Sequence, residues 1–307
     1  MTNERDDYEP SIVRPGDRLL AIANPATRRD VRQIIGALRH AAPDGVTIDT
    51  HITRRAGQAR ELAEQYGSGA RLLVAIGGDG TVGDVAAAAV DHAIPLAILP
   101  GGSTNIIARE LGIPSDPAAG AALIFGQHRL VTMDAGVCGD RIFLHMVGAG
   151  FDSRFFARSN QALKRKFGWL AYLPAATRTL FDKPVETRVV VDGDEVRAIT
   201  TMVLVANGPS VIHPSLRIAS EISVSDGVFD VFMITARSGA EKAGVLGRMF
   251  TRQIDASPHV IRLRGREVVI ETDPPLPVQF DGDVDGETPV QLRMLPGAVR
   301  LVVPPGP

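Results

Sequence analysis

The chain lacks most features that mark secreted, membrane-spanning or nucleic-acid-binding proteins. Its 307 residues include one cysteine, which excludes both an intramolecular disulfide and a cysteine zinc cluster. No apolar run approaches the roughly 20 residues that a membrane-spanning helix needs. The 33 basic and 35 acidic residues nearly balance, so no nucleic-acid partner is expected. The acidic start MTNERDDYEP is unlike a secretory signal, and these absences together predict a cytoplasmic protein.

The length and the pattern of apolar residues predict two domains with a cleft between them. Between residues 17 and 131, strand-like runs alternate with helix-like stretches, which predicts an open α/β sheet of mostly parallel strands. From 132 to 293 the segments are β-rich, which predicts a mainly antiparallel second domain. The strand-like runs of the first domain are RLLAIAN (18–24), VTIDTHIT (46–53), RLLVAIG (71–77) and PLAILP (95–100).

Polar and glycine-rich loops follow each of these four runs. In open α/β sheets, ligands bind beyond the carboxyl ends of the strands. We therefore expect Asn24, Thr53 and the loops 77–81 and 101–104 to converge on one crevice.

The strongest local motif is GGDGT at 77–81, between a strand-like run and a helix-like stretch. Glycines let the backbone approach a phosphate, and the N–H groups of the following helix attract anions. Asp79 is a candidate to hold a metal or to organise the attacking hydroxyl. The alternative is a tight strand-to-helix turn that binds no ligand.

Two familiar nucleotide-binding motifs do not fit the chain. Gly78, Gly80 and Gly83 satisfy G-x-G-x-x-G, but the next strand ends in Pro100 and Gly101, without the acidic residue that would hold a ribose. A dehydrogenase is therefore disfavoured. The G-x-x-x-x-G-K-[ST] loop is absent, so phosphates would have to be held in another way.

The segment DGDVDGE at 281–287 begins like a calcium loop, but its twelfth position is Leu292, which cannot chelate. Two interpretations remain open. One is a hairpin turn rich in Asp and Gly. The other is a general base with a supporting carboxylate, drawn from Asp281 and Asp283.

A basic and aromatic segment at 164–173 (KRKFGWLAYL) is typical of a membrane surface, because Trp and Tyr lie at headgroup level while Lys and Arg attract anionic lipid. A helix packed on its own domain is the more common alternative. The oligomeric state stays open, with a homodimer among the options.

Several ordered motifs resemble those of the diacylglycerol kinase catalytic-domain superfamily, which includes bacterial lipid kinases and sphingosine and ceramide kinases. The resemblance spans nearly the whole chain. Its motifs are GGDGT (77–81), LPGGSTNIIARELGIP (99–114), FLHMVGAGFD (143–152), VLVANG (203–208), SDGVFDV (225–231) and VQFDGD (278–283).

The resemblance implies an N-terminal α/β ATP-binding domain and a C-terminal β-sandwich, with ATP and Mg²⁺ bound between them and residues 294–304 returning to the first domain. It implies a kinase that phosphorylates a diacylglycerol-like or sphingoid-like hydroxyl in lipid metabolism, peripherally at the inner membrane face. The implied ATP-binding residues are Asn24, Thr27, Thr53, Gly77, Gly78, Asp79, Gly80, Thr81, Val82, Gly83, Gly102, Ser103 and Thr104.

The resemblance also implies a proton acceptor and a structural magnesium site. Asp283 is the counterpart of the acceptor, with Asp281 and Asp79 as rivals. The magnesium positions correspond to Ser223, Asp226 and the backbone of Val228.

The chain departs from the family at several of these positions. Asp283 replaces a longer Glu, Ser223 replaces a carboxylate, and the first loop reads Asn24, Pro25, Ala26, Thr27, Arg28 where the family has Asn-Pro-x-Ser-Gly. Two alternatives therefore stay open: an NAD kinase-like phosphotransferase, and a catalytically impaired nucleotide-binding regulator.

Overall fold

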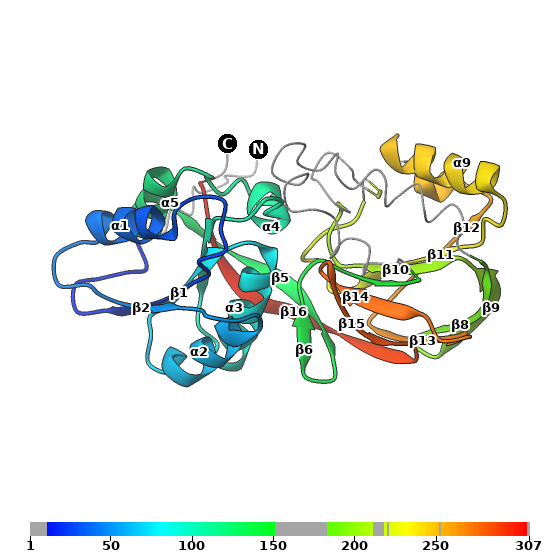
Figure 1. Ribbon diagram of the computed structural model, residues 1–307, viewed down its shortest axis with the longest axis horizontal. Coiled ribbons are helices and arrows are strands. Elements are labelled where there is room, and N and C mark those ends of the chain that lie inside the picture. The colour runs from blue at the N-terminus through cyan, green and yellow to red at the C-terminus, as the bar shows by residue number, and fades with distance from the viewer. Residues whose placement is uncertain (1–10, 151–182, 211–217, 220, 252, 306–307) are drawn as a thin grey trace, which may run out of the picture. The chain divides into compact units, whose positions relative to one another are not determined.

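The computed structural model describes residues 11–150, 183–210, 218–219, 221–251 and 253–305 (Figure 1). Contacts divide the chain into two units, the first containing the chain up to Met133 and again from Ala298, the second containing Asp134–Gly297. The chain thus passes between the units twice, within β5 (Arg129–Cys138) and within β16 (Val290–Val303).

The first unit is built on a parallel sheet with the order β2-β1-β3-β4-β16. The end of β16 joins β4 through the pairing of Leu301 with Leu96. β3 and β4 are buried along their whole length, as expected of parallel strands covered on both faces. The other strands of this sheet and their bounds are β1 (Arg18–Ala23), β2 (Thr47–Ile52), β3 (Leu72–Gly77) and β4 (Leu96–Pro100).

Two pairs of helices cover this sheet. α1 (Val31–Ala41) packs with α5 (Pro117–Phe125), α2 (Gln58–Gly67) packs with α3 (Asp79–Asp91), and Figure 1 shows the two pairs on opposite faces. A short helix, α4 (Ile106–Glu110), follows β4. The apolar stripe of α1 has helical spacing and turns inward at Val31, Ile34, Ile35 and Leu38.

The second unit contains two sheets built largely from antiparallel pairs. The first has the order β12-β11-β10-β7-β14-β15, and the second runs β16-β13-β8-β9, with β5 pairing β16 and β6. Their strands are β6 (Arg141–Phe143), β7 (Met146–Ala149), β8 (Val185–Val191), β9 (Asp194–Thr200), β10 (Met202–Ala206), β11 (Phe229–Ile234), β12 (Val260–Gly265), β13 (Glu267–Asp273), β14 (Pro277–Phe280) and β15 (Asp283–Glu287).

The inner faces of these two sheets share one core, which makes the unit a β-sandwich. Val203 and Val231 from one sheet pack in the same buried cluster as Val189 and Val268 from the other. On the outer face of the six-stranded sheet, α9 (Gly239–Phe250) contributes Val245 to a second buried cluster. A 3₁₀ turn, Ile254–Ala256, follows this helix.

The N-terminal α/β and C-terminal antiparallel sandwich expected from the sequence are confirmed. Two helices differ from expectation. The helix-like stretch 104–113 shortens to the five residues of α4, and α9 was not anticipated although Ser238 and Glu241 form a capping box at its start.

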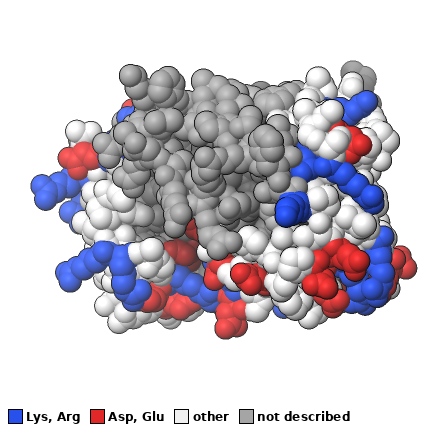
Figure 2. Space-filling view, turned by 45° about the vertical axis from the view of Figure 1, so that its right-hand side comes forward, with Lys and Arg blue, Asp and Glu red and all other residues white. Residues whose placement is uncertain are grey.

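The described surface carries charge of both signs. On the face in Figure 2, basic and acidic side chains are interspersed, in keeping with the formal net charge of -2. Among the described residues, every helix is too short or too polar to span a bilayer.

Candidate functional site

The loops after β1 and β3 contact each other at the carboxyl edge of the parallel sheet. The Asn24 N–H donates to the Ile76 carbonyl at 2.9 Å, and the Asn24 side-chain amide lies 3.3 Å from the Thr81 hydroxyl. Asn24 Oδ1 accepts the N–H of Ala26 at 2.9 Å, which folds the first loop into a tight turn. The structure thus brings Asn24 and the GGDGT motif together.

The loops after β3 and β4 approach each other backbone to backbone. A Cβ atom on Gly102 would lie 2.6 Å from the Cα of Gly78, and a Cβ on Gly78 would lie 3.3 Å from the Cα of Gly102. A Cβ on Gly101 would lie 2.6 Å from the Thr27 side chain. The Gly102 contact is with backbone, so only glycine allows it, and the half-buried Gly78 and Gly102 leave a surface of bare main chain between the two loops.

Two side chains fix the geometry of this glycine surface. Asn105, with φ of 46°, accepts the Gly102 N–H and donates to the Gly102 carbonyl, both at 2.9 Å. Asp79 accepts the N–H of Ile106 at 2.7 Å. Asn105 was missed by sequence reasoning, although Asn is among the few residues that tolerate a positive φ.

The N-terminus of α3 opens beside the same loops. Its N-cap is Gly78, which makes no side-chain capping bond, and Gly80 in the first turn is exposed. The first N–H groups of a helix have no partner within it and carry a partial positive charge. This end of α3 is therefore suited to an anion.

Two predicted ligand-contacting residues turn inward. Val82 is 3% exposed, and its N–H donates to the Gly78 carbonyl at 3.1 Å, so its side chain belongs to the core. Any contact of Val82 with ATP would therefore be made through its backbone, and its place among the ATP-binding residues stays a prediction. Thr53 is 5% exposed and its N–H donates to the Ala23 carbonyl at 2.9 Å. Ser103, Thr104 and Gly83 are half-buried.

In the second unit, the DGD segment is a hairpin turn between β14 and β15, and Asp281 shapes it. Its carboxylate accepts three backbone N–H groups, each at 2.8 Å, from Leu144, His145 and Met146. The Asp281 N–H donates back to the Met146 carbonyl at 2.9 Å, and its φ is 50°. Both carboxylate oxygens are thus used to hold the start of β7.

Asp283 lies on the same turn but faces outward, with its side chain 71% exposed. Arg141 on β6 lies 3.9 Å from Asp283 and 2.6 Å from Asp285. The Arg141 guanidinium also stacks 4.9 Å from the centre of the Phe280 ring. Arg141, which sequence reasoning missed, therefore anchors the carboxylate turn to the neighbouring hairpin.

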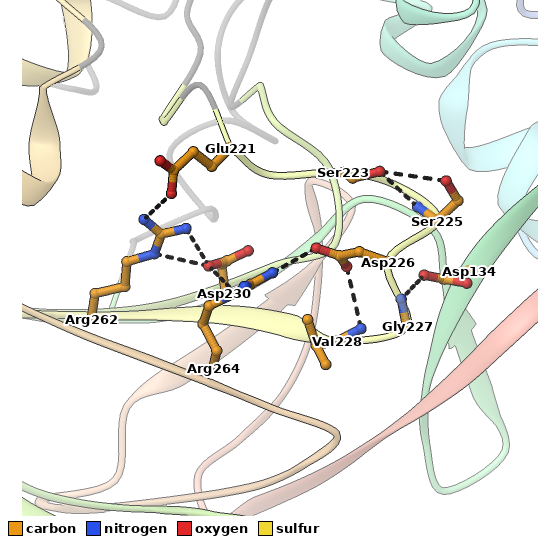
Figure 3. Close-up of polar contacts among 10 residues, drawn as sticks. All are labelled: Asp134, Glu221, Ser223, Ser225, Asp226, Gly227, Val228, Asp230, Arg262 and Arg264. Atoms are coloured by element: carbon orange, nitrogen blue, oxygen red, sulfur yellow. Dashed lines mark hydrogen bonds and ion pairs between the residues drawn. The ribbon is translucent and has the colours of Figure 1, made fainter. Parts of the chain in front are cut away.

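The side chains at two of the three predicted magnesium positions, Asp226 and Ser223, are already engaged with donors of the chain itself (Figure 3). Asp226 Oδ2 lies 2.6 Å from Arg264, and Asp226 Oδ1 accepts the Val228 N–H at 3.3 Å. The Ser223 hydroxyl oxygen accepts the Ser225 N–H at 3.3 Å. Throughout the described residues, no group of three or more His, Cys, Asp or Glu side chains is arranged to hold a metal. These residues do not fit a structural magnesium ion.

One predicted surface cannot be placed. The basic and aromatic segment 164–173 lies outside the described residues, as does part of the FLHMVGAGFD motif.

Comparison with known families assigns both units. The model of the diacylglycerol kinase catalytic domain matches residues 18–138, and that of the "YegS C-terminal NAD kinase beta sandwich-like domain" matches residues 145–303. The chain belongs to the diacylglycerol kinase catalytic-domain family. The assignment confirms the resemblance drawn from the motifs and supports a kinase activity.

Individual similar proteins show the extent of the likeness. A Pseudomonas putida protein named "Probable lipid kinase YegS-like" is 31% identical over 292 residues, which cover 92% of each chain. A Synechocystis protein, "Uncharacterized protein sll0036", is 28% identical over 258 residues, which cover 82% of this chain but only 59% of that protein. The structure also superposes on "The crystal structure of a diacylglycerol kinases from Bacillus anthracis str. Sterne" with a TM-score of 0.74 and 22% sequence identity. The match covers 98% of this chain and 99% of the Bacillus anthracis chain, and it shows that the two share a fold.

Proposed function

We propose that this protein is an ATP- and Mg²⁺-dependent lipid kinase that transfers the γ-phosphate to a hydroxyl of a diacylglycerol-like or sphingoid-like lipid. The observation that carries the proposal is the backbone-to-backbone approach of Gly78 and Gly102 beside the N-terminus of α3. Main-chain N–H groups and a helix N-terminus are a recurrent way to bind phosphate without a P-loop. MgATP enters as a substrate, and its metal neutralises charge on the transferring group.

In this proposal the first unit holds the nucleotide. The 77–81 and 101–104 loops bind the phosphates, and the contact between Asn24 and Thr81 keeps the neighbouring loop in register with them. Asp79 acts as a positioning residue, since its hydrogen bond to Ile106 fixes the second loop against the first. Positioning and electrostatic stabilisation supply most of the rate in phosphoryl transfer, so rigid loops favour catalysis.

We assign the general base to Asp283 in preference to Asp281. The three N–H groups on Asp281 give that carboxylate a structural task, whereas Asp283 is exposed. Asp283 would accept the proton of the lipid hydroxyl while the hydroxyl oxygen forms a bond to the γ-phosphorus. The bond between the γ-phosphorus and the β,γ-bridging oxygen breaks, and ADP leaves with that electron pair.

A lipid acceptor also requires access to a membrane. We propose that the protein works in the cytoplasm and reaches its substrate peripherally at the inner membrane face, with the 164–173 segment as the contact. The support is the sequence of that segment, in which Lys164, Arg165 and Lys166 precede Trp169 and Tyr172.

The base assignment is tested by phosphorylation of lipid in mixed micelles. Asp283→Asn keeps the shape of the side chain and removes its charge, and general-base catalysis typically contributes about 10²–10⁴-fold, so we expect a loss of kcat of that order. Asp285→Asn is the matched control, because Asp285 lies on the same hairpin and pairs with the same Arg141. Equal turnover by Asp283→Asn and Asp285→Asn would overturn the assignment.

A further inference from the structure

Two arginines on β12 lie against Asp230 in β11 and against Asp226 in the loop that precedes this strand (Figure 3). Arg264 Nη2 is 2.6 Å from Asp226 Oδ2, and Arg264 Nε is 3.2 Å from Asp230 Oδ1. Arg262 donates two hydrogen bonds to the same Asp230 oxygen, at 2.9 and 2.7 Å. Asp230 and Arg264 are directly opposite in the antiparallel register, so the strand pairing itself presents the arginine to the carboxylates.

The cluster has a strong requirement for positive charge. The Asp230 side chain is 1% exposed, and a buried carboxylate is stable only when it is paired and hydrogen-bonded. The second Asp230 oxygen is buried and has no hydrogen-bond partner among the described residues. Arg262 is shared with Asp255, at 2.9 Å, so Arg264 is the cation that joins Asp230 to Asp226.

A divalent cation and Arg264 compete for the same place. Mg²⁺ binds oxygen ligands at about 2.0–2.1 Å in near-octahedral geometry. Asp226 would have to release Arg264 to become such a ligand, and Ser223 offers a neutral hydroxyl that already accepts a backbone N–H. Arginine, in contrast, keeps its charge at every physiological pH and forms fixed, directional bonds to carboxylates.

We propose that Arg264 supplies, as a permanent guanidinium, the positive charge that the family resemblance assigns to a structural magnesium ion at Asp226. The arginine bridges Asp226 and Asp230 and thereby fixes the loop that leads into β11. This inference is independent of the catalytic proposal, because it concerns only how this loop is held.

The loop matters because it is tied to both places where the chain passes between its units. Asp134 accepts the N–H of Gly227 at 2.6 Å and that of Gly297 at 2.7 Å, and its own N–H donates to the Val224 carbonyl at 2.7 Å. Asp134 and Gly297 are the first and last residues of the second unit. The hydrogen bonds at these two passages of the chain should therefore form equally well with and without free Mg²⁺.

The test is thermal unfolding of the full chain without nucleotide, in EDTA and in millimolar Mg²⁺. We expect the wild-type Tm to be the same in both. Arg264→Ala should lower the Tm in EDTA by about 2–6 °C. Mg²⁺ should recover part of this loss, because Asp226 and the buried oxygen of Asp230 then lack the bridging charge. Adding Asp226→Asn to Arg264→Ala should abolish the recovery.

Arg197→Ala is the matched control, because Arg197 is an arginine on an exposed strand, 72% exposed and paired with Glu195. Its Tm should match the wild type in both conditions. The proposal is overturned by one joint result: the wild-type Tm is lower in EDTA than in Mg²⁺, and Asp226→Asn removes this difference. It is also overturned if Arg264→Ala unfolds at the wild-type Tm. If Arg264→Ala fails to fold, the Tm of the wild type and of Asp226→Asn is compared in EDTA and in Mg²⁺. A Mg²⁺-dependent Tm in the wild type that Asp226→Asn removes would overturn the proposal, and a wild-type Tm that is the same in both conditions would support it.

Discussion

Replacing Gly102 with alanine should damage nucleotide binding severely. The new Cβ would lie 2.6 Å from the Cα of Gly78 and 2.8 Å from Asn105 Oδ1. Carbon atoms in contact prefer about 3.5–4.0 Å, so the two loops would have to separate by about 1 Å. Overpacking of this kind costs about 1–3 kcal/mol, and a displacement of about 1 Å near reacting groups can lower the rate about 100-fold.

Gly36→Ala provides the control for this prediction. Gly36 lies on the exposed side of α1, and a Cβ there would meet nothing within 4 Å. The substitution should stabilise the protein by about 0.5–1 kcal/mol, because alanine loses less conformational freedom than glycine in a helix.

Calorimetric titration with a non-hydrolysable ATP analogue, with kcat/KM measured in parallel, compares the two variants. We expect Gly102→Ala to bind at least about tenfold more weakly, which corresponds to about 1.4 kcal/mol. Wild-type affinity in Gly102→Ala would refute the account of the glycine surface.

Two further predictions concern the second unit. Asp281→Ala leaves three backbone N–H groups without their acceptor, so it should destabilise the protein by about 2–4 kcal/mol in urea unfolding, whereas Asp283→Ala should change stability by less than about 0.5 kcal/mol. Equal stabilities would contradict the division of roles. Burial raises the pKa of the Cys138 thiol, so its alkylation should be slower at pH 8 than that of a free cysteine and should accelerate only above the usual thiol range. Because Cys138 is the only cysteine of the chain, mass spectrometry of the intact protein measures the rate of its alkylation. Alkylation at the rate of free cysteine would show that the pKa of Cys138 is not raised.

The sequence predicted the parts of the molecule whose signals are local. Alternating apolar runs and helical stretches define the α/β sheet, and Gly78 and Gly102 follow neighbouring parallel strands, so topology alone places them at one edge. The β-rich texture after residue 131 likewise predicted the antiparallel sandwich.

The contacts that the sequence could not predict are those set by the pairing of strands that are far apart in the chain. The family resemblance assigned Asp226 to magnesium, whereas the residue that engages its carboxylate, Arg264, lies 38 positions further along the chain. The pairing of β11 with β12 decides that contact, and no local pattern encodes it. Arg141 and Asp285 are separated by 144 positions and meet for the same reason. Val82 sits in the first turn of α3, where the rotation of the helix, which the motif does not specify, buries its side chain.

The central claim is the transfer of phosphate from ATP to a lipid hydroxyl. The most direct measurement is incubation of the protein with Mg²⁺ and γ-labelled ATP, with a total lipid extract in mixed micelles, with NAD, or with no acceptor. The account predicts a labelled lipid whose chromatographic mobility identifies the acceptor. Label in NAD, or in no product at all, would contradict it and would favour an NAD kinase-like enzyme or a nucleotide-binding regulator.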